Sequence, residues 1–79
     1  NVYVGLNTTN MPFLADGYQN RSIAYLNLNN LDQALKDATK AIEIDPSDTS
    51  RFGTRANVYR KLGKVALAEA DESAAAAKP

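Results

Sequence analysis

A pattern of aromatic, small and charged residues recurs in this chain after 34 residues, and this internal repeat constrains the fold more than any other feature. Tyr18 returns as Phe52, and Tyr25 returns as Tyr59. The same shift relates six further pairs of positions: Arg21 and Arg55, Ser22 and Ala56, Leu28 and Leu62, Ala34 and Ala68, Asp37 and Asp71, Ala41 and Ala75. A period of this size is typical of stacked helical repeats.

Helical periodicity divides each copy of the repeat into two helices. The first copy predicts helices over about residues 13–28 and 31–45, and the second over about residues 48–62 and 65–77. The face of the first helix that is expected to turn toward the second carries Tyr18, Ser22, Tyr25 and Leu28. We expect Tyr25 and Tyr59 to be buried between the helices of their own repeats.

The segment from Gly17 to Pro46 resembles a tetratricopeptide repeat. The positions that carry the resemblance in the first copy are Tyr18, Ser22, Tyr25, Ala34, Ala41 and Pro46. In the second copy they are Phe52, Ala56, Tyr59, Gly63, Ala68 and Ala75. The resemblance implies an all-α fold in which two helix–turn–helix hairpins stack as a short right-handed solenoid, with repeats at about 15–48 and 49–79.

Two kinds of position depart from the family pattern. Arg21 and Arg55 stand where the family usually has leucine, and each second helix lacks the expected large residue, with Ala38 in one copy and Glu72 in the other. Each arginine lies on the first helix of its repeat, and each of Asp37 and Asp71 lies on the second. We therefore expect Arg21 to pair with Asp37 and Arg55 with Asp71 across the hairpins.

Residues 1–12 do not fit the repeat and are expected to form an extended, non-helical N-terminal arm, which leaves residues 13–79 as the repeat domain. A degraded upstream repeat is the alternative interpretation, because Pro12 lies 34 residues before Pro46. The chain begins with Asn1 rather than methionine, which indicates processing or a longer parent protein.

The composition favours a binding protein over an enzyme. The sequence contains no histidine and no cysteine, so the commonest general base and the thiolate are both absent. Its carboxylates are scattered without partners for a metal, and we expect no catalytic activity, no metal and no cofactor. The net charge is zero and no apolar run is long enough for a membrane span, so neither nucleic acid nor a membrane is an expected partner.

The charges are unevenly distributed along the chain. Residues 51–64 contain five basic residues and no acidic one. Two interpretations stay open: ion pairs with neighbouring helices, or a basic strip that attracts an acidic partner.

The resemblance implies that the first helices of the two repeats form a concave wall that binds extended peptides or partner helices. The candidate partner-binding residues on this wall are Gln19, Asn20, Ile23, Asn27, Gly53, Thr54, Asn57 and Lys61. Asn20 also resembles the asparagine with which some members of the family grip a peptide carboxylate, although Ser50 and Thr54 replace the basic residues of that clamp.

The expected function is protein–protein interaction. A structural subunit that self-assembles through its exposed repeat ends is the alternative, because the last helix is rich in alanine and covers little of the core. The C-terminal helix or the N-terminal arm would then make the contact between copies.

Overall fold

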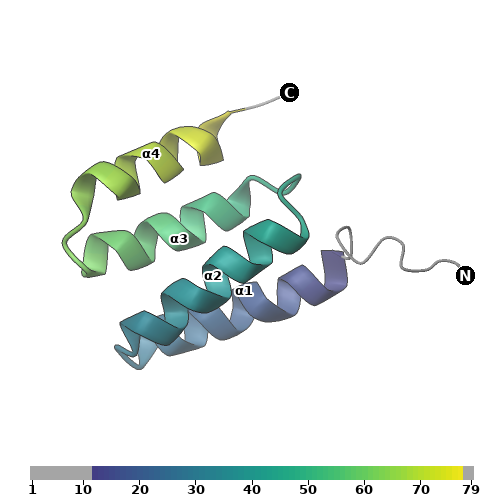
Figure 1. The fold of residues 1–79 in the computed structure, drawn as a ribbon, viewed down its shortest axis with the longest axis horizontal. Helices are drawn as coiled ribbons and strands as arrows, with labels where there is room; N and C mark the ends of the chain where they lie inside the picture. Colours follow the sequence, from purple (N-terminus) through teal and green to yellow (C-terminus); the bar gives the residue numbers. More distant parts are fainter. Residues whose placement is uncertain (1–11, 78–79) are drawn as a thin grey trace, which may run out of the picture.

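The computed structural model describes residues 12–77, and the predicted N-terminal arm therefore lies almost entirely outside the described residues. Four helices and no strand occupy this part of the chain, which confirms the all-α prediction (Figure 1). The helices are α1 (Pro12–Asn27), α2 (Leu31–Ile44), α3 (Ser50–Lys61) and α4 (Val65–Ala76). Helix α2 ends directly before Asp45–Pro46, as expected where a proline disfavours helical backbone at the preceding residue.

Each hairpin turns through the same backbone motif. Asn29 after α1 and Gly63 after α3 both have positive φ, at 61° and 78°. The amide that follows each of them donates to a carbonyl five residues back, at Tyr25 and Tyr59. Such left-handed C-terminal turns satisfy the carbonyls that a helix end leaves free, and glycine or asparagine adopts them most readily.

The helices of each hairpin pack through small residues. Ala15, Ala34, Ala41 and Ala68 are completely buried. Ser22 is also fully buried, and its hydroxyl donates a hydrogen bond of 2.7 Å to the carbonyl of Ala34 on α2. These side chains allow the helix backbones to approach closely, and the buried hydroxyl has the partner that it requires.

The inward face of α1 differs from the prediction at one position. Ser22 is buried as expected, but Leu28 lies in the turn after α1 and is 75% exposed. Tyr25 and Tyr59 are half-buried, and the guanidinium groups of Arg21 and Arg55 lie over their rings. The prediction that Leu28 faces inward was therefore wrong, although its helix was correctly placed.

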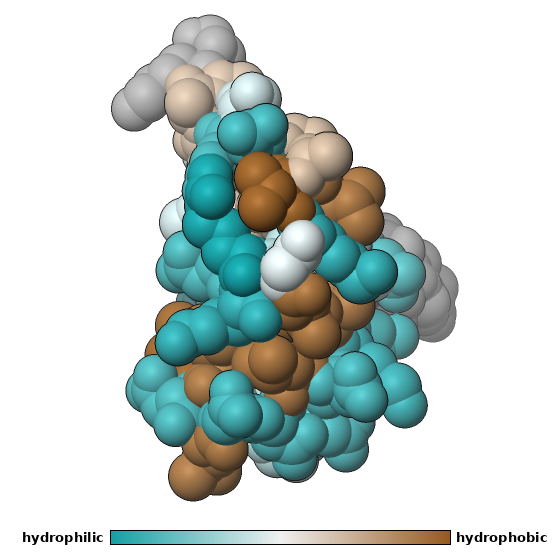
Figure 2. Space-filling model, turned by 90° about the vertical axis from the view of Figure 1, so that its left-hand side faces the viewer, coloured by the Kyte–Doolittle hydropathy of each residue, from teal (hydrophilic) through white to brown (hydrophobic). Residues whose placement is uncertain are grey.

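The two hairpins lie one above the other in Figure 1, with α2 packed against α3 and α4 on the far side of α3. Helix α1 also contacts α3, so the first helices of the two repeats are neighbours. Figure 2 looks onto the end of the molecule that carries both hairpin turns, and apolar residues gather in its lower half, at the level of the first hairpin.

Replacing Ala41 with leucine should destabilise the protein. Ala41 is fully buried beside Ala15 and Ile44, so extra methylene groups must displace its neighbours at a cost of about 1–3 kcal/mol. Urea unfolding followed by circular dichroism measures the change. Lys36→Leu, at an exposed site on the same helix, is the control and should stay within about 0.5 kcal/mol. Equal stability of the two variants would contradict the packing described here.

Candidate functional site

Helices α1 and α3 contact each other, and their outer surfaces are here called the A-helix wall. Of the residues predicted to bind a partner, five are exposed on this wall: Asn20, Ile23, Asn27, Asn57 and Lys61. Ile23 is 41% exposed, and the other four exposed residues carry three amides and one ammonium group. Amides can hydrogen-bond a peptide backbone as donors and acceptors, and an exposed aliphatic side chain can contact an apolar one.

Two of the predicted residues are placed differently. Thr54 is buried, at 8% exposure, and accepts a 2.9 Å hydrogen bond from the side-chain amide of Gln19, which joins α3 to α1. Gly53 faces α4: a Cβ atom built on it would lie 3.8 Å from the Cβ of Ala75. The prediction placed both on the open wall, and this is corrected here because the neighbouring helices cover them. Gln19 is half-buried and borders the wall.

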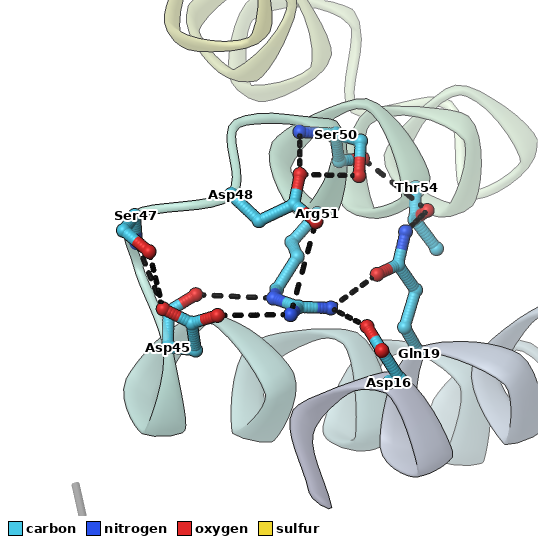
Figure 3. Close-up of polar contacts among 8 residues, drawn as sticks. All are labelled: Asp16, Gln19, Asp45, Ser47, Asp48, Ser50, Arg51 and Thr54. Carbon is cyan, nitrogen blue, oxygen red and sulfur yellow. Dashed lines mark hydrogen bonds and ion pairs between the residues drawn. The ribbon is translucent and has the colours of Figure 1, made fainter. Parts of the chain in front are cut away.

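A buried arginine joins the two hairpins beside this wall (Figure 3). The side chain of Arg51 is 1% exposed. Its Nη2 lies 3.0 Å from Oδ2 of Asp45, and its Nε donates to the Asp45 carbonyl at 3.1 Å. Its Nη1 lies 2.9 Å from Oδ1 of Asp16 and also donates to the side-chain oxygen of Gln19. One guanidinium therefore connects α3 to α1 and to the end of α2.

Sequence reasoning did not find this cluster. Asp45 and Arg51 are separated by a proline-containing loop, so no helical spacing links them, and Asp16 is 35 residues from Arg51. One signal was available in the sequence. Arg51 corresponds to Gly17 in the first copy, so this arginine is not part of the repeated pattern and belongs to the contact between the two hairpins.

The electrostatics of the joint favour the charged forms of its residues. Burial lowers the pKa of Arg51, but the carboxylates of Asp45 and Asp16 outweigh it and raise that pKa above its ordinary value. The hydroxyl of Ser47 and then the guanidinium of Arg51 hold the pKa of Asp45 below its usual range. The pKa of Asp48 is lowered too, chiefly by its hydrogen bonds from Ser50.

The two predicted Arg–Asp pairs are confirmed. Arg21 donates to Asp37 from Nε at 2.7 Å and from Nη2 at 2.9 Å, and Arg55 donates to Asp71 in the same way at 2.8 and 3.0 Å. Each guanidinium also lies 5.6–5.9 Å from the centres of two aromatic rings on its own helix. Such a bidentate pair between aromatic rings combines charge-assisted hydrogen bonds with cation–π attraction.

The basic stretch at residues 51–64 is largely used inside the chain. Arg51 and Arg55 pair as described, and Arg60 makes two hydrogen bonds to Glu72 on α4. Ion pairs between neighbouring helices thus account for the three arginines of the stretch. The ammonium of Lys61 is exposed on the A-helix wall.

Among residues 12–77, no cluster of histidine, cysteine, aspartate and glutamate is arranged to hold a metal ion. None of the helices in that range combines the length and the apolar character required to cross a bilayer.

Two hairpins with a 34-residue repeat and a duplicated Arg–Asp–aromatic arrangement define a helical-repeat protein. The model of the tetratricopeptide repeat family matches residues 15–48. The chain is therefore a tetratricopeptide repeat protein, a class whose repeats generally mediate protein–protein interaction.

Its relatives among curated proteins are much longer. The chain is 41% identical over 58 residues to protein unc-45 homolog B of Danio rerio, in a match that covers 73% of this chain. It is 44% identical over 54 residues to protein unc-45 homolog B of Xenopus tropicalis, which covers 68% of this chain. The chain spans about 6% of the length of each of these relatives. No solved structure matches it significantly.

Replacing Arg51 with methionine should destabilise the protein strongly. The change leaves the buried carboxylate of Asp45 without its counter-charge, which typically costs about 3 kcal/mol or more. Chemical denaturation at neutral pH measures the loss. Arg60→Met removes an exposed pair with Glu72 and should change stability little. If both variants were equally stable, Arg51 would not be holding the hairpins together.

The protein should lose stability in acid. The pKa values of Asp45 and Asp48 are lower in the folded chain than in the unfolded one. Their stabilisation is therefore complete above the ordinary carboxyl pKa of about 4 and is lost as the pH falls below it. Melting temperatures measured between neutral pH and about pH 3 should show this fall, and Asp45→Asn should show a smaller one. A melting temperature that rises on acidification would contradict the assignment.

Proposed function

We propose that this chain binds a protein partner, as an extended peptide or a helix, on the A-helix wall. The observation that carries the proposal is that the two helices of the wall expose the apolar side chain of Ile23 and the polar side chains of Asn20, Asn27, Asn57 and Lys61. An apolar contact next to groups that hydrogen-bond a main chain suits a peptide in extended conformation.

The rigidity of the wall supports the proposal. Gln19 and Arg51 tie α1 to α3 by hydrogen bonds at the border of the exposed residues. A wall whose helices are held in place loses little conformational freedom when a peptide binds, which favours affinity. The arginines inside the repeats are occupied by aspartates, so the exposed cation that this wall offers to an acidic residue of the partner is Lys61.

A second candidate function is self-assembly through the repeat ends. Val65 on α4 is 49% exposed, and Phe13 and Leu14 at the start of α1 are 71% and 40% exposed. Apolar side chains at both ends of a stacked array favour contacts with further repeats, because each unit buries its surface against a neighbour.

An array of short unstructured peptides, probed with the labelled chain, tests the wall. Peptides that bind the wild type should bind Ile23→Asp at least about tenfold more weakly, equivalent to ~1.4 kcal/mol. The change removes the apolar contact and adds a charge at an exposed position. Asn57→Ala should also weaken binding, because it removes an amide.

Leu67→Asp is the matched control, since it makes the same kind of change on α4, away from the wall. It should leave peptide binding unchanged. Circular dichroism establishes that all three variants are folded. The wall assignment would be abandoned if Leu67→Asp reduced binding and Ile23→Asp did not.

A further inference from the structure

Helix α3, the first helix of the second repeat, has another helix packed against its outer side. Helix α2 lies against α3, where Arg51 reaches Asp45 and the Nη1 of Arg55 donates to the hydroxyl of Thr39 at 3.5 Å. On this side of α3, the residues at successive helical turns are all buried or half-buried: Arg51, Arg55, Val58 and Leu62.

The same side of α1 is open within the part of the chain that the structure describes. The positions that match those four residues after the 34-residue shift are all exposed: Gly17, Arg21, Ala24 and Leu28. The spacing of four and three residues places Gly17, Arg21 and Ala24 on one face of α1, and Leu28 follows in the turn. These four positions are here called the α1 end face. The side chain of Arg21 is 58% exposed, whereas that of Arg55, covered by α2, is 20% exposed.

The α1 end face is hollowed and apolar around this arginine. Leu14, Gly17, Tyr18 and Arg21 line a hollow of about 190 Å³. A Cβ atom built on Gly17 would meet nothing within 4 Å, so the space stands open where Arg51 fills the matching place in the second repeat. The hydrogen bonds of Arg21 to Asp37 use Nε and Nη2, which leaves its Nη1 at the position from which Arg55 reaches Thr39.

Helix α4 corresponds, after the 34-residue shift, to α2, which is the helix that covers α3. Leu35, Thr39 and Ile42 of α2 are half-buried, and the 34-residue shift takes them to Glu69, Ser73 and Ala76 of α4, which are all exposed. Ser73 therefore has a hydroxyl at the position that corresponds to Thr39, whose hydroxyl accepts from Arg55. Glu69 lies one turn before it on the same face and adds a charge opposite to that of Arg21.

We propose that α4 of one copy of this chain packs on the α1 end face of a second copy, in the way that α2 packs on α3. The hydroxyl of Ser73 then accepts from the Nη1 of Arg21, and the small Ala76 lies over the apolar part of the face. This inference deepens the second candidate function, because it names the two surfaces through which the chain would assemble.

The contact is head-to-tail, since it joins two different surfaces. Every assembly therefore keeps a free α1 end face at one end and a free α4 at the other, and association continues into an open series rather than stopping at a dimer. Because Glu69 and Ala76 replace the aliphatic Leu35 and Ile42, the contact between copies buries less apolar surface than the contact between α2 and α3. Association should accordingly be weak and should depend strongly on concentration.

Sedimentation equilibrium of the full 79-residue chain over a wide concentration range tests the proposal. The mean mass of the wild type should rise continuously with concentration. Leu28→Glu blocks the α1 end face, and Ser73→Lys blocks α4; both replace exposed residues, so both variants should fold. Each variant alone should remain a monomer, because every contact needs one surface of each kind.

An equimolar mixture of the two variants provides the decisive measurement. Leu28→Glu retains an intact α4 and Ser73→Lys an intact α1 end face, so the mixture should form a dimer and nothing larger. Leu67→Glu is the matched control: Leu67 corresponds to Gln33, an exposed residue of α2 away from α3. It should associate like the wild type.

The outcomes separate this inference from the proposed functions. A wild type that stays monomeric at every concentration overturns both self-assembly and the α4 contact, whereas peptide binding on the A-helix wall is measured independently. If the wild type associates and both single variants associate equally well, self-assembly stands and the surfaces named here are wrong. A mixture that remains monomeric also refutes the head-to-tail contact.

Discussion

The buried charge of Arg51 is the constraint on which the arrangement of the two hairpins depends. A guanidinium removed from water must be neutralised, and here the neutralising groups come from separate elements, with Asp45 after α2 and Asp16 on α1. Moving either hairpin would leave the arginine or its buried carboxylate without a partner. The orientation of α3 relative to α1, and with it the A-helix wall, therefore follows from one side chain.

This dependence is strong because the apolar core is made of small side chains. Alanines supply most of the fully buried apolar positions, and Val58 is the largest apolar side chain among the fully buried ones. Small side chains bury little area each, and hydrophobic stabilisation scales with buried apolar area. Bidentate arginine pairs and the buried hydroxyl of Ser22 consequently carry a large share of the specificity of packing.

The sequence was sufficient to predict the features that occur in both repeats and the contacts that lie within one hairpin. The 34-residue shift placed four helices and the Arg21–Asp37 and Arg55–Asp71 pairs, because each pair lies inside one hairpin. It did not predict the Arg51 joint, which forms between hairpins and has no second copy to reveal it. The shift also misplaced Leu28: the register is correct, but the position faces outward in the first repeat because no described helix packs against it there.

The unequal exposure of the two duplicated arginine pairs makes the hairpins differ in their response to ionic strength. Dissolved ions screen an exposed pair far more than one shielded by neighbouring helices. The pair of Arg21 lies in contact with solvent, whereas α2 shields the pair of Arg55. Concentrated salt therefore weakens the first hairpin preferentially, so that two hairpins built on the same pattern form one salt-sensitive half and one salt-resistant half of the molecule.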